Sequence, residues 1–325
     1  MTLMTKPLLK VERLCRYFRL DRTRVLRAVD DVSFEIARGE ILGIVGESGC
    51  GKSTLGRTIL GLHPLTSGKV LFDGRDVHAA RGAERLRFKR RAQIVLQDSY
   101  ESLNPRMTIG EIVAEGLEAH RIVSSKKERE GRVCRLLERM GLSPMFRSRF
   151  PHELSGGQRQ RVGIARALAV EPEFLVCDEP ISALDVSVQA QIVNLFASLR
   201  EELGLTLLFI AHDLAMVRHL SDRVGVLYMG GLVELAPTST LYSRPLHPYT
   251  RALLSSIPDV DPDNPLSGRR IKLSGEVTSP IGAPKGCRFA PRCPLVTPLC
   301  RDTVPDLVEA EPGHLVACHL AAPSE

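Results

Sequence analysis

Short apolar runs alternate with amphipathic segments over residues 8–236. The runs at residues 40–45, 174–177 and 205–210 are rich in Ile, Leu, Val and Phe, and each ends at a turn that carries Gly, acidic residues or His. Runs of this length are too short for buried helices and are typical of strands that are covered on both faces. They predict a sheet that is mostly parallel.

Helical periodicity follows these runs. Residues 53–62 have helical character, and residues 187–203 carry apolar side chains at spacings of three and four. The apolar positions of that second segment are Val188, Ile192, Leu195, Phe196 and Leu199. Buried strands separated by helices indicate an α/β fold in which helices wrap a mostly parallel sheet.

The strand pattern disappears between about residues 107 and 170. Within this stretch, residues 126–140 form an amphipathic pattern with Val133, Leu136, Leu137 and Met140 on one face. We therefore predict a helical insertion over residues 107–170.

A compositional change near residue 236 divides the chain. Fourteen of the 21 prolines lie from Pro237 onward, within the last 89 residues. Such a density of proline predicts short elements joined by loops. We expect a main domain over residues 8–236 and a small extension, rich in Pro and Cys, over residues 237–325.

Bulk composition narrows the class of protein only slightly. The 325 residues are 43% hydrophobic and 25% charged, with a net charge of +6, which suits a folded domain and is weak support for any particular partner. No apolar run reaches the roughly 18–20 residues that cross a bilayer, and the first residues lack the pattern of a signal peptide. We expect a cytosolic protein that acts at a membrane, if at all, through partners.

Residues 46–54, Gly-Glu-Ser-Gly-Cys-Gly-Lys-Ser-Thr, fit the phosphate-binding loop pattern completely and lie between a predicted strand and a predicted helix. The glycines allow backbone N–H groups to converge on phosphate oxygens, and the helix adds its positive end. We expect Lys52 to reach the outer phosphates and the Ser53 hydroxyl to bind Mg²⁺. The candidate nucleotide-binding residues here are Gly46, Ser48, Gly49, Cys50, Gly51, Lys52, Ser53 and Thr54.

Two acidic residues end the apolar run at residues 174–177. A buried strand that ends in Asp178 and Glu179 brings both carboxylates to the edge of the sheet where nucleotides bind. We expect Asp178 to complete the Mg²⁺ ligands and Glu179 to act as the general base on the attacking water.

A second candidate anion site follows at residues 154–158, Leu-Ser-Gly-Gly-Gln. Ser155, Gly156, Gly157 and Gln158 open a predicted helix, far along the chain from the phosphate loop. Because one nucleotide already has its loop at residue 46, this second site is expected to serve a nucleotide that is bound to another copy.

With these motifs together, the chain resembles the ABC transporter ATPase family along essentially its whole length. The resemblance implies a P-loop NTPase cassette with an antiparallel β subdomain at its N-terminus. It implies that residues 155–158 contact the γ-phosphate held by the opposite cassette. The resemblance implies that Tyr17, or alternatively Phe18, stacks on adenine, and that His212 contacts the γ-phosphate. It implies that Gln97 binds Mg²⁺ and couples the cassette to the membrane partner. Asp185, in the loop 182–185, is implied in communication between cassettes. Ser99 departs from the family, which usually has Pro at this position.

The resemblance also implies a reaction and partners. Lys52, Gln97, Glu179 and His212 would hydrolyse ATP with Mg²⁺ held by Ser53, Gln97 and Asp178. Residues 97–107 and 246–254 resemble the dipeptide and oligopeptide importer subfamily, and residues 26–31 and 53–58 resemble its F-type ATPase subunit. The implied partners are a homologous second ATPase subunit, two transmembrane permease subunits and an extracytoplasmic solute-binding protein, at the cytoplasmic face of the cell membrane. Nickel or another small solute is the alternative cargo.

Four of the eight cysteines gather in the extension, at Cys287, Cys293, Cys300 and Cys318. Four thiolates suit Zn²⁺ or an iron–sulfur cluster, and the spacing lacks the Cys-x2-Cys pairs that are typical of structural zinc. The subfamily resemblance implies a [4Fe–4S] cluster, which we expect to be structural. The alternatives are Zn²⁺ and four free thiols, and His314 and His319 are expected not to be ligands.

Two other kinds of function fit the sequence less well. Soluble ABC ATPases that act on ribosomes or nucleic acid usually carry two cassettes or long coiled-coil insertions, and this chain has neither. A zinc module that binds nucleic acid would need clustered basic and aromatic residues around the cysteines. Arg288, Phe289 and Arg292 are present, but nearby acidic residues offset them. We therefore expect no nucleic-acid partner.

Overall fold

The computed structural model of the chain describes residues 6–97, 100, 102–182, 184–257, 271, 273, 281–282 and 285–321. Several positions that the sequence drew attention to lie outside the described residues. These are Asp98, Ser99 and Glu101, which follow Gln97, and Ala183 in the loop 182–185.

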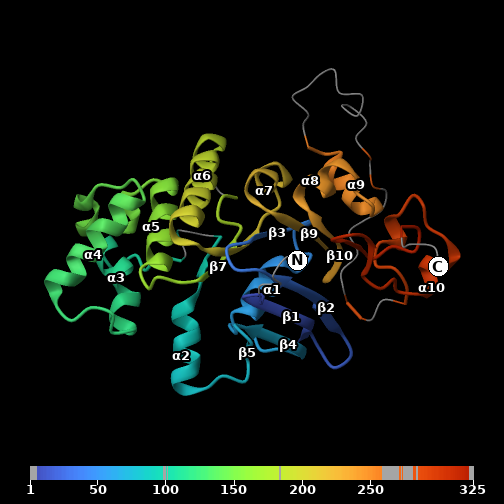
Figure 1. Ribbon diagram of the computed structural model, residues 1–325, viewed down its shortest axis with the longest axis horizontal. Helices are drawn as coiled ribbons and strands as arrows, with labels where there is room; N and C mark the ends of the chain where they lie inside the picture. The colour runs from blue at the N-terminus through green and yellow to red at the C-terminus, as the bar shows by residue number, and fades with distance from the viewer. Residues whose placement is uncertain are drawn as a thin grey trace.

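An eight-stranded sheet forms the centre of the molecule (Figure 1). Five neighbouring strands are parallel, and each of the last three pairs antiparallel with the strand before it. The strand order is β11 (Val308–Glu311), β12 (His314–Val316), β10 (Gly231–Pro237), β9 (Arg223–Tyr228), β3 (Ile41–Val45), β8 (Thr206–Ile210), β7 (Phe174–Asp178) and β6 (Ala92–Val95). The predicted α/β class with a mostly parallel sheet is confirmed.

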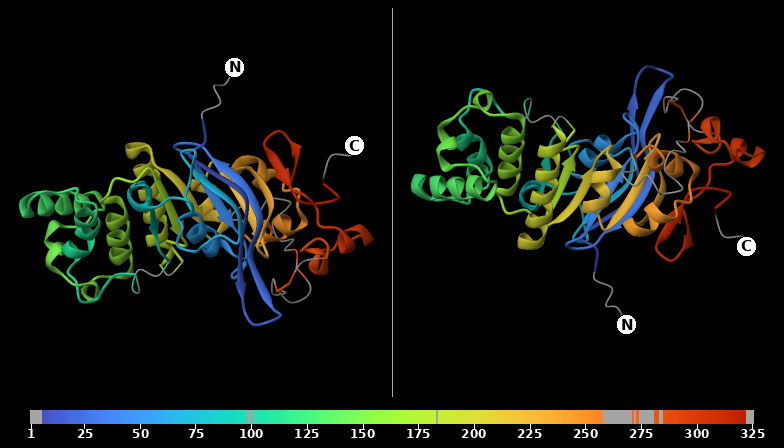
Figure 2. Two further views of the ribbon diagram at one scale, coloured as in Figure 1. Left: turned by 90° about the horizontal axis from the view of Figure 1, so that it is seen from below. Right: turned by 90° about the horizontal axis from the view of Figure 1, so that it is seen from above.

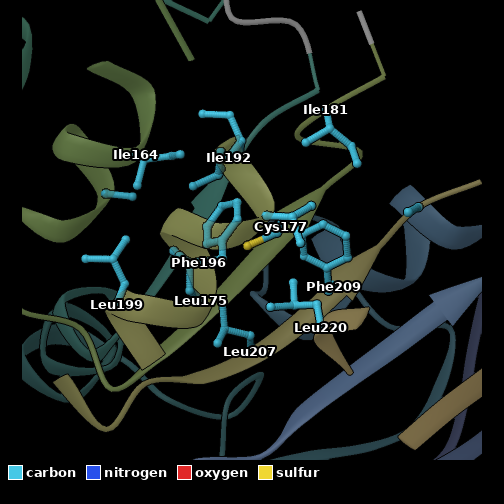
Figure 3. Packing of buried hydrophobic residues seen from close by; sticks show 14 of the residues in the cluster. Ile164, Leu175, Cys177, Ile181, Ile192, Phe196, Leu199, Leu207, Phe209 and Leu220 are labelled. Atoms are coloured by element: carbon cyan, nitrogen blue, oxygen red, sulfur yellow. The ribbon is translucent and has the colours of Figure 1, made fainter. Parts of the chain in front are cut away.

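The parallel strands are buried on both faces, as their apolar runs predict. In β3, Ile41 and Val45 pack in one hydrophobic cluster while Leu42 and Ile44 pack in the other. Figure 3 shows part of the first cluster, in which side chains of β7 and β8 pack against helix α6 (Val186–Leu203). Successive side chains of a strand point to opposite faces, so one short run supplies both layers.

A second, antiparallel sheet covers the other face of the central sheet. Its strand order is β2 (Val25–Ile36), β1 (Leu9–Arg19), β4 (Ser67–Phe72) and β5 (Arg75–Asp76). Helix α1 (Lys52–Ile59) lies between the two sheets, and its buried Leu55 and Ile59 join the cluster that they enclose. This arrangement agrees with the antiparallel β subdomain that the family resemblance implies.

The described residues between β6 and β7 form helices, as predicted for 107–170. After α2 (Gly82–Arg91) and β6, the chain continues through α3 (Ile109–Ala119), α4 (Lys126–Arg139), two short 3-10 helices (Pro144–Ser148 and Pro151–Glu153) and α5 (Gly156–Leu168). This group lies at the end of the molecule opposite the C-terminal segments (Figure 2).

The chain beyond β10 returns to the central sheet. It contributes α8 (Thr238–Ser243), α9 (Pro248–Leu254), a 3-10 helix (Ala290–Arg292), α10 (Pro298–Asp302) and the β11–β12 hairpin. Strand β12 pairs with β10, at Glu234 with Val316 and at Leu235 with Leu315. The composition predicted short elements here, and the pairing of a hairpin with the sheet was not predicted.

Within the described parts of the chain, no helix combines the length and apolar character that a membrane span requires. Helix α7 (Leu214–Leu220) completes the described helices and covers the same face of the central sheet as α6.

Candidate functional site

The phosphate loop connects β3 to α1 and passes close to neighbouring backbone. A Cβ atom on Gly51 would lie 1.9 Å from the carbonyl oxygen of Ala28, and one on Gly46 would lie 2.2 Å from that of Leu227. Gly51 also has a φ of 109°, in the region that favours glycine. Both positions therefore require glycine for steric reasons, independently of any ligand.

Lys52 is folded back over this loop. Its side chain is 3% exposed. The ammonium group donates to the carbonyl oxygens of Gly46 at 2.9 Å and Glu47 at 3.0 Å. It lies 3.6 Å from Oε1 of Glu179. The loop thus holds a buried positive charge where an anionic ligand would meet the loop's backbone N–H groups.

The side chains of the three other predicted catalytic residues lie around the carboxylate of Glu179. Besides Lys52, its carboxylate accepts a hydrogen bond from Nε2 of Gln97 at 3.0 Å and lies 3.6 Å from Nδ1 of His212. The four residues come from the phosphate loop and from the ends of β6, β7 and β8, which are neighbours in the central sheet. Segments far apart in sequence therefore converge at one edge, as expected for parallel strands.

Asp178 fits a cation ligand. It is fully buried, and its Oδ2 accepts from Arg57 at 3.3 Å while its Oδ1 is buried without a hydrogen-bond partner. A buried carboxylate oxygen without a partner is costly unless a ligand satisfies it. Ser53 and Gln97 lie on the flanking segments, so the residues expected to hold Mg²⁺ border one region.

The side chain of Tyr17 is held by contacts with neighbouring side chains. Its hydroxyl donates a short hydrogen bond to Asp30, and the guanidinium group of Arg27 lies 4.9 Å from the centre of its ring. Burial, followed by the hydrogen bond to Asp30, raises the pKa of Tyr17. Neighbouring Phe18 packs edge-on against His63 and carries Arg16 at 4.2 Å over its ring.

Residues Ser155, Gly156, Gly157 and Gln158, the signature residues from here on, begin helix α5 as a capping box. The Ser155 hydroxyl accepts from the N–H of Gln158 at 3.3 Å, and the side chain of Gln158 accepts from the N–H of Ser155 at 2.9 Å. A Cβ on Gly157 would lie 2.6 Å from Val188 of α6, so glycine permits this close packing. Figure 1 shows that α5 lies in the helical part, away from α1.

Asp185 performs a similar task at the start of α6. Its carboxylate accepts from the Ser187 hydroxyl at 2.7 Å and from the N–H of Val188 at 2.9 Å. The Ser187 hydrogen bond, followed by that from Val188, lowers the pKa of Asp185. The start of α6 and the start of α5 are thus joined through Val188 and Gly157.

Two residues of the extension contact the phosphate loop, and sequence reasoning did not identify them as site residues. Arg292 forms a two-pronged ion pair with the carboxylate of Glu47, at 2.8 and 3.1 Å. The Tyr249 hydroxyl accepts from the N–H of Glu47 at 3.0 Å. Tyr249 lies in the motif 246–254, and Arg292 immediately precedes Cys293, so both motifs were noted without a link to this loop.

The four cysteines of the extension lie in the described part of the chain as free thiols. Among the described residues, no three His, Cys, Asp or Glu side chains are arranged as a metal site. Burial, and then the proximity of Cys300 and Cys318, raise the pKa of Cys287. The backbone N–H of Cys287 also donates to the carbonyl of Cys300 at 2.8 Å. The thiols are therefore near one another but do not form a ligand set in this conformation.

Comparison with known proteins supplies the family. The pattern of the ABC transporter family matches residues 29–182, and the pattern of the oligopeptide/dipeptide transporter C-terminal region matches residues 233–300. YkfD of Bacillus subtilis, provisionally named an oligopeptide transport ATP-binding protein, is 55% identical over 97% of this chain and 95% of its own length. The chain belongs to the ABC transporter ATP-binding proteins. The resemblance to this family and to its oligopeptide branch is confirmed.

Other relatives of this ABC protein agree. AppF and OppF of Bacillus subtilis, both named oligopeptide transport ATP-binding proteins, are each 52% identical to it, over 91% and 97% of the chain and 90% and 97% of their own lengths. A solved structure of the cassette MJ0796, a dimer in a post-hydrolysis state bound to ADP and phosphate, superposes with a TM-score of 0.65 at 31% identity. It covers 71% of this chain and 98% of its own. The chain is accordingly an ABC-type ATPase that uses ATP and Mg²⁺.

Proposed function

We propose that this ABC ATPase powers the uptake of di- and oligopeptides across the cell membrane. The observation that carries the proposal is the C-terminal region at residues 233–300, which matches the oligopeptide/dipeptide transporter pattern. Relatives that cover nearly the whole chain are named for oligopeptide transport. Peptides are therefore preferred over nickel or another small solute as the cargo.

Within this proposal, the phosphate loop binds the triphosphate of ATP. The backbone N–H groups of residues 46–54 hydrogen-bond the phosphate oxygens, and the start of α1 adds its positive end. Lys52 turns from the carbonyl oxygens of Gly46 and Glu47 toward the outer phosphates. Tyr17 stacks on the adenine. Ser53, Gln97 and Asp178 would hold Mg²⁺, which would supply positive charge to the triphosphate.

Hydrolysis then depends on how Glu179 is held. Gln97, Lys52 and His212 surround its carboxylate, and a general base must be aimed at the proton that it removes. Glu179 orients the attacking water and takes its proton as the water oxygen bonds to the γ-phosphorus. The bond from this phosphorus to the β–γ bridging oxygen breaks, so ADP leaves and phosphate is formed. His212 contacts the γ-phosphate as charge accumulates on it. Catalysis is thus mainly positioning and charge stabilisation.

The signature residues act on a second cassette. Ser155, Gly156, Gly157 and Gln158 begin α5, at a distance from the phosphate loop of their own chain, and a helix start with free N–H groups suits a phosphate. Asp185 transmits closure between the cassettes through α6. Since each ATP site then needs residues of two chains, binding closes the pair and hydrolysis reopens it.

The assembled importer contains further subunits. We infer a heterodimer with a homologous ATPase subunit, two transmembrane permease subunits and an extracytoplasmic solute-binding protein. The chain would lie peripherally on the cytoplasmic face of the membrane through the permeases. The match of residues 233–300 to the transporter C-terminal region supports this arrangement. We expect no nucleic-acid partner.

The four cysteines carry a separate proposal, that Cys287, Cys293, Cys300 and Cys318 bind a [4Fe–4S] cluster or, alternatively, Zn²⁺. Their electrostatic proximity supports it, although ligation would require the thiols to turn toward a common centre. Iron, sulfide and zinc content after anaerobic purification tests it, with a Cys300→Ser variant as the control. Protein that contains neither metal would refute it.

Peptide-stimulated ATP hydrolysis tests the main proposal. The chain is co-expressed with its permease and ATPase partners, and turnover is measured with and without the solute-binding protein and di- or tripeptides. We expect stimulation by peptide in the complete complex and its loss when Glu179→Gln replaces the wild-type chain. Brisk hydrolysis by the isolated chain that no membrane partner alters would instead support a soluble ATPase.

A further inference from the structure

Glu47 of the phosphate loop has all of its polar groups engaged by other residues. Its carbonyl accepts from Lys52 at 3.0 Å, its N–H donates to the Tyr249 hydroxyl at 3.0 Å, and its carboxylate pairs with Arg292 at 2.8 and 3.1 Å. Two of these three partners come from the C-terminal extension. The extension therefore fixes both the backbone and the side chain of a residue that in turn holds Lys52.

The surroundings of Arg292 hold its side chain in a fixed position beside Glu47. Its side chain is only 8% exposed, and its guanidinium group lies 6.0 Å from the centre of the Tyr228 ring. Tyr228 packs at 4.5 Å from Tyr249 and at 5.3 Å from Phe289, measured between ring centres. A two-pronged arginine–carboxylate pair against an aromatic wall is directional, so the pair defines where Glu47 lies.

The same segment reaches the opposite side of the loop through Arg288. This side chain donates to the carbonyl of Met229 at 3.2 Å and to the Asp30 carboxylate at 2.7 Å. Asp30 is the residue that binds the Tyr17 hydroxyl. The N–H of Gly230 donates to the carbonyl of Cys50 in the phosphate loop at 2.8 Å. The segment 287–293 thus extends from the phosphate loop toward the residue expected to stack on adenine.

The charge on Glu47 explains why the pair matters to a nucleotide. A carboxylate within the phosphate loop repels a triphosphate, and this repulsion is strong where water is excluded. Arg292 neutralises that charge and fixes the position of the carboxylate through two hydrogen bonds. Without Arg292, Glu47 would be an uncompensated negative charge beside the phosphates, and the loop would lose a fixed point.

We propose that Arg292 is a positioning residue for the phosphate loop, through which segment 287–293 of the extension sets the affinity of the cassette for ATP. The inference rests on ATP binding at residues 46–54 and does not depend on the cargo. Its test measures nucleotide binding by the isolated full chain, so it can fail while the peptide-import proposal stands, and the reverse.

The first measurement is the Kd of a non-hydrolysable MgATP analogue, by calorimetry, for Arg292→Met. We expect Kd to rise about tenfold with one binding site per chain retained. Arg301→Met is the matched control, since Arg301 is an exposed arginine of the same extension with no ion pair among the described residues, and its Kd should change less than about twofold. In steady-state hydrolysis, KM should rise while kcat changes little.

The double variant Arg292→Met/Glu47→Gln separates positioning from mere structural support. Removing the carboxylate also removes the uncompensated charge, so most of the lost affinity should return, to within about threefold of wild type. Tyr249→Phe, a small change that leaves the N–H of Glu47 without its acceptor, should weaken binding about three- to tenfold even if Arg292→Met fails to fold. An unchanged Kd in Tyr249→Phe or in folded Arg292→Met would overturn the proposal. So would a double variant as weak as Arg292→Met, or a loss seen only as fewer binding-competent molecules.

Discussion

At the scale of single residues, Glu179 combines a chemical role with an unusual backbone. Its φ is 47°, a left-handed conformation that non-glycine residues adopt infrequently. Its N–H is held by the carbonyl of Ile210 at 2.9 Å, which helps to maintain this conformation. Backbone strain of this kind is concentrated at functional sites. Here it accompanies a carboxylate that meets Lys52, Gln97 and His212.

Glu179→Gln should separate binding from hydrolysis. The amide keeps the size of the side chain but cannot accept a proton, so the hydrolysis rate should fall by about 10²–10⁴-fold while MgATP binding is retained. Calorimetry and phosphate release, measured on the same preparation, check both parts. A hydrolysis rate within about threefold of wild type would mean that another group acts as the base.

Gly51→Ala and Gly163→Ala should have opposite effects. A Cβ at residue 51 would lie 1.9 Å from the Ala28 carbonyl, whereas a Cβ at residue 163 in α5 would meet no described atom within 4 Å apart from the adjacent backbone of its own helix. We expect Gly51→Ala to abolish nucleotide binding and lower the free energy of unfolding. Gly163→Ala should raise it by about 0.5–1 kcal/mol. Denaturant unfolding and nucleotide titration of both variants test the steric argument, which equal effects would refute.

At the scale of elements, apolar runs and residue periodicity predicted strands β3, β7 and β8 and helices α1, α4 and α6. Residues 205–210 and 126–140 match β8 and α4 to within one residue at each end, because apolar runs and spacings of three and four are local properties. The β11–β12 hairpin was not predicted. Its strands are four and three residues long, and they are stabilised by pairing with β10, which the local sequence does not encode.

Helix α9 begins at a buried histidine that makes the fold sensitive to acid. His247 caps the helix by accepting from the N–H of Tyr249, and burial, followed by the nearby charge of Arg251, lowers its pKa to about 3. The unfolded chain binds a proton below its ordinary pKa of 6.5, whereas the folded chain does not until about pH 3. The contribution of His247 to the free energy of unfolding is therefore fully present above pH 6.5. It is lost as the pH falls from 6.5 toward 3.

We expect wild type to lose about 2 kcal/mol of unfolding free energy through His247 between pH 7 and pH 5. His247→Asn keeps an acceptor for the cap and removes the titrating group, so its loss over the same interval should be smaller by that amount. Urea unfolding of both proteins at the two pH values measures the difference. Parallel losses in the two proteins would contradict the assignment.

At the scale of the whole molecule, the extension is part of the cassette rather than an appended tail. Its hairpin extends the central sheet, its aromatic residues pack beside the phosphate loop, and Arg292 pairs with Glu47. The sequence motifs predicted ATP-site residues one by one, because Lys52 and Glu179 lie in recognisable local patterns. Arg292 lies in no such pattern, and its contact with the loop depends on the fold that brings it to Glu47.

A buried hydrogen bond between a histidine and a glutamate anchors this arrangement. Glu234 of β10 is fully buried, and its carboxylate accepts from His314 of β12 at 2.7 Å and from the N–H groups of Leu246 and His247. His314→Leu would leave the carboxylate with one partner fewer. We expect it to lower the free energy of unfolding by about 2–4 kcal/mol.

His319→Leu is the matched control for this prediction. His319 is only partly buried, and its Nε2 donates a single hydrogen bond to the Thr303 carbonyl at 3.0 Å, so its loss should cost under about 1 kcal/mol. Urea unfolding of the two variants compares them directly. If both variants unfold at the same urea concentration, the buried pair does not anchor the extension.

The most direct test of the account is peptide uptake by proteoliposomes that contain the complete importer. ATP is trapped on the side of the cassettes, and the solute-binding protein and labelled di- or tripeptide are added on the other side. The account predicts ATP-dependent accumulation of peptide with the wild-type chain and none with Glu179→Gln. Accumulation that persists with Glu179→Gln, or absence of ATP-dependent uptake in a wild-type complex that still hydrolyses ATP, would contradict it.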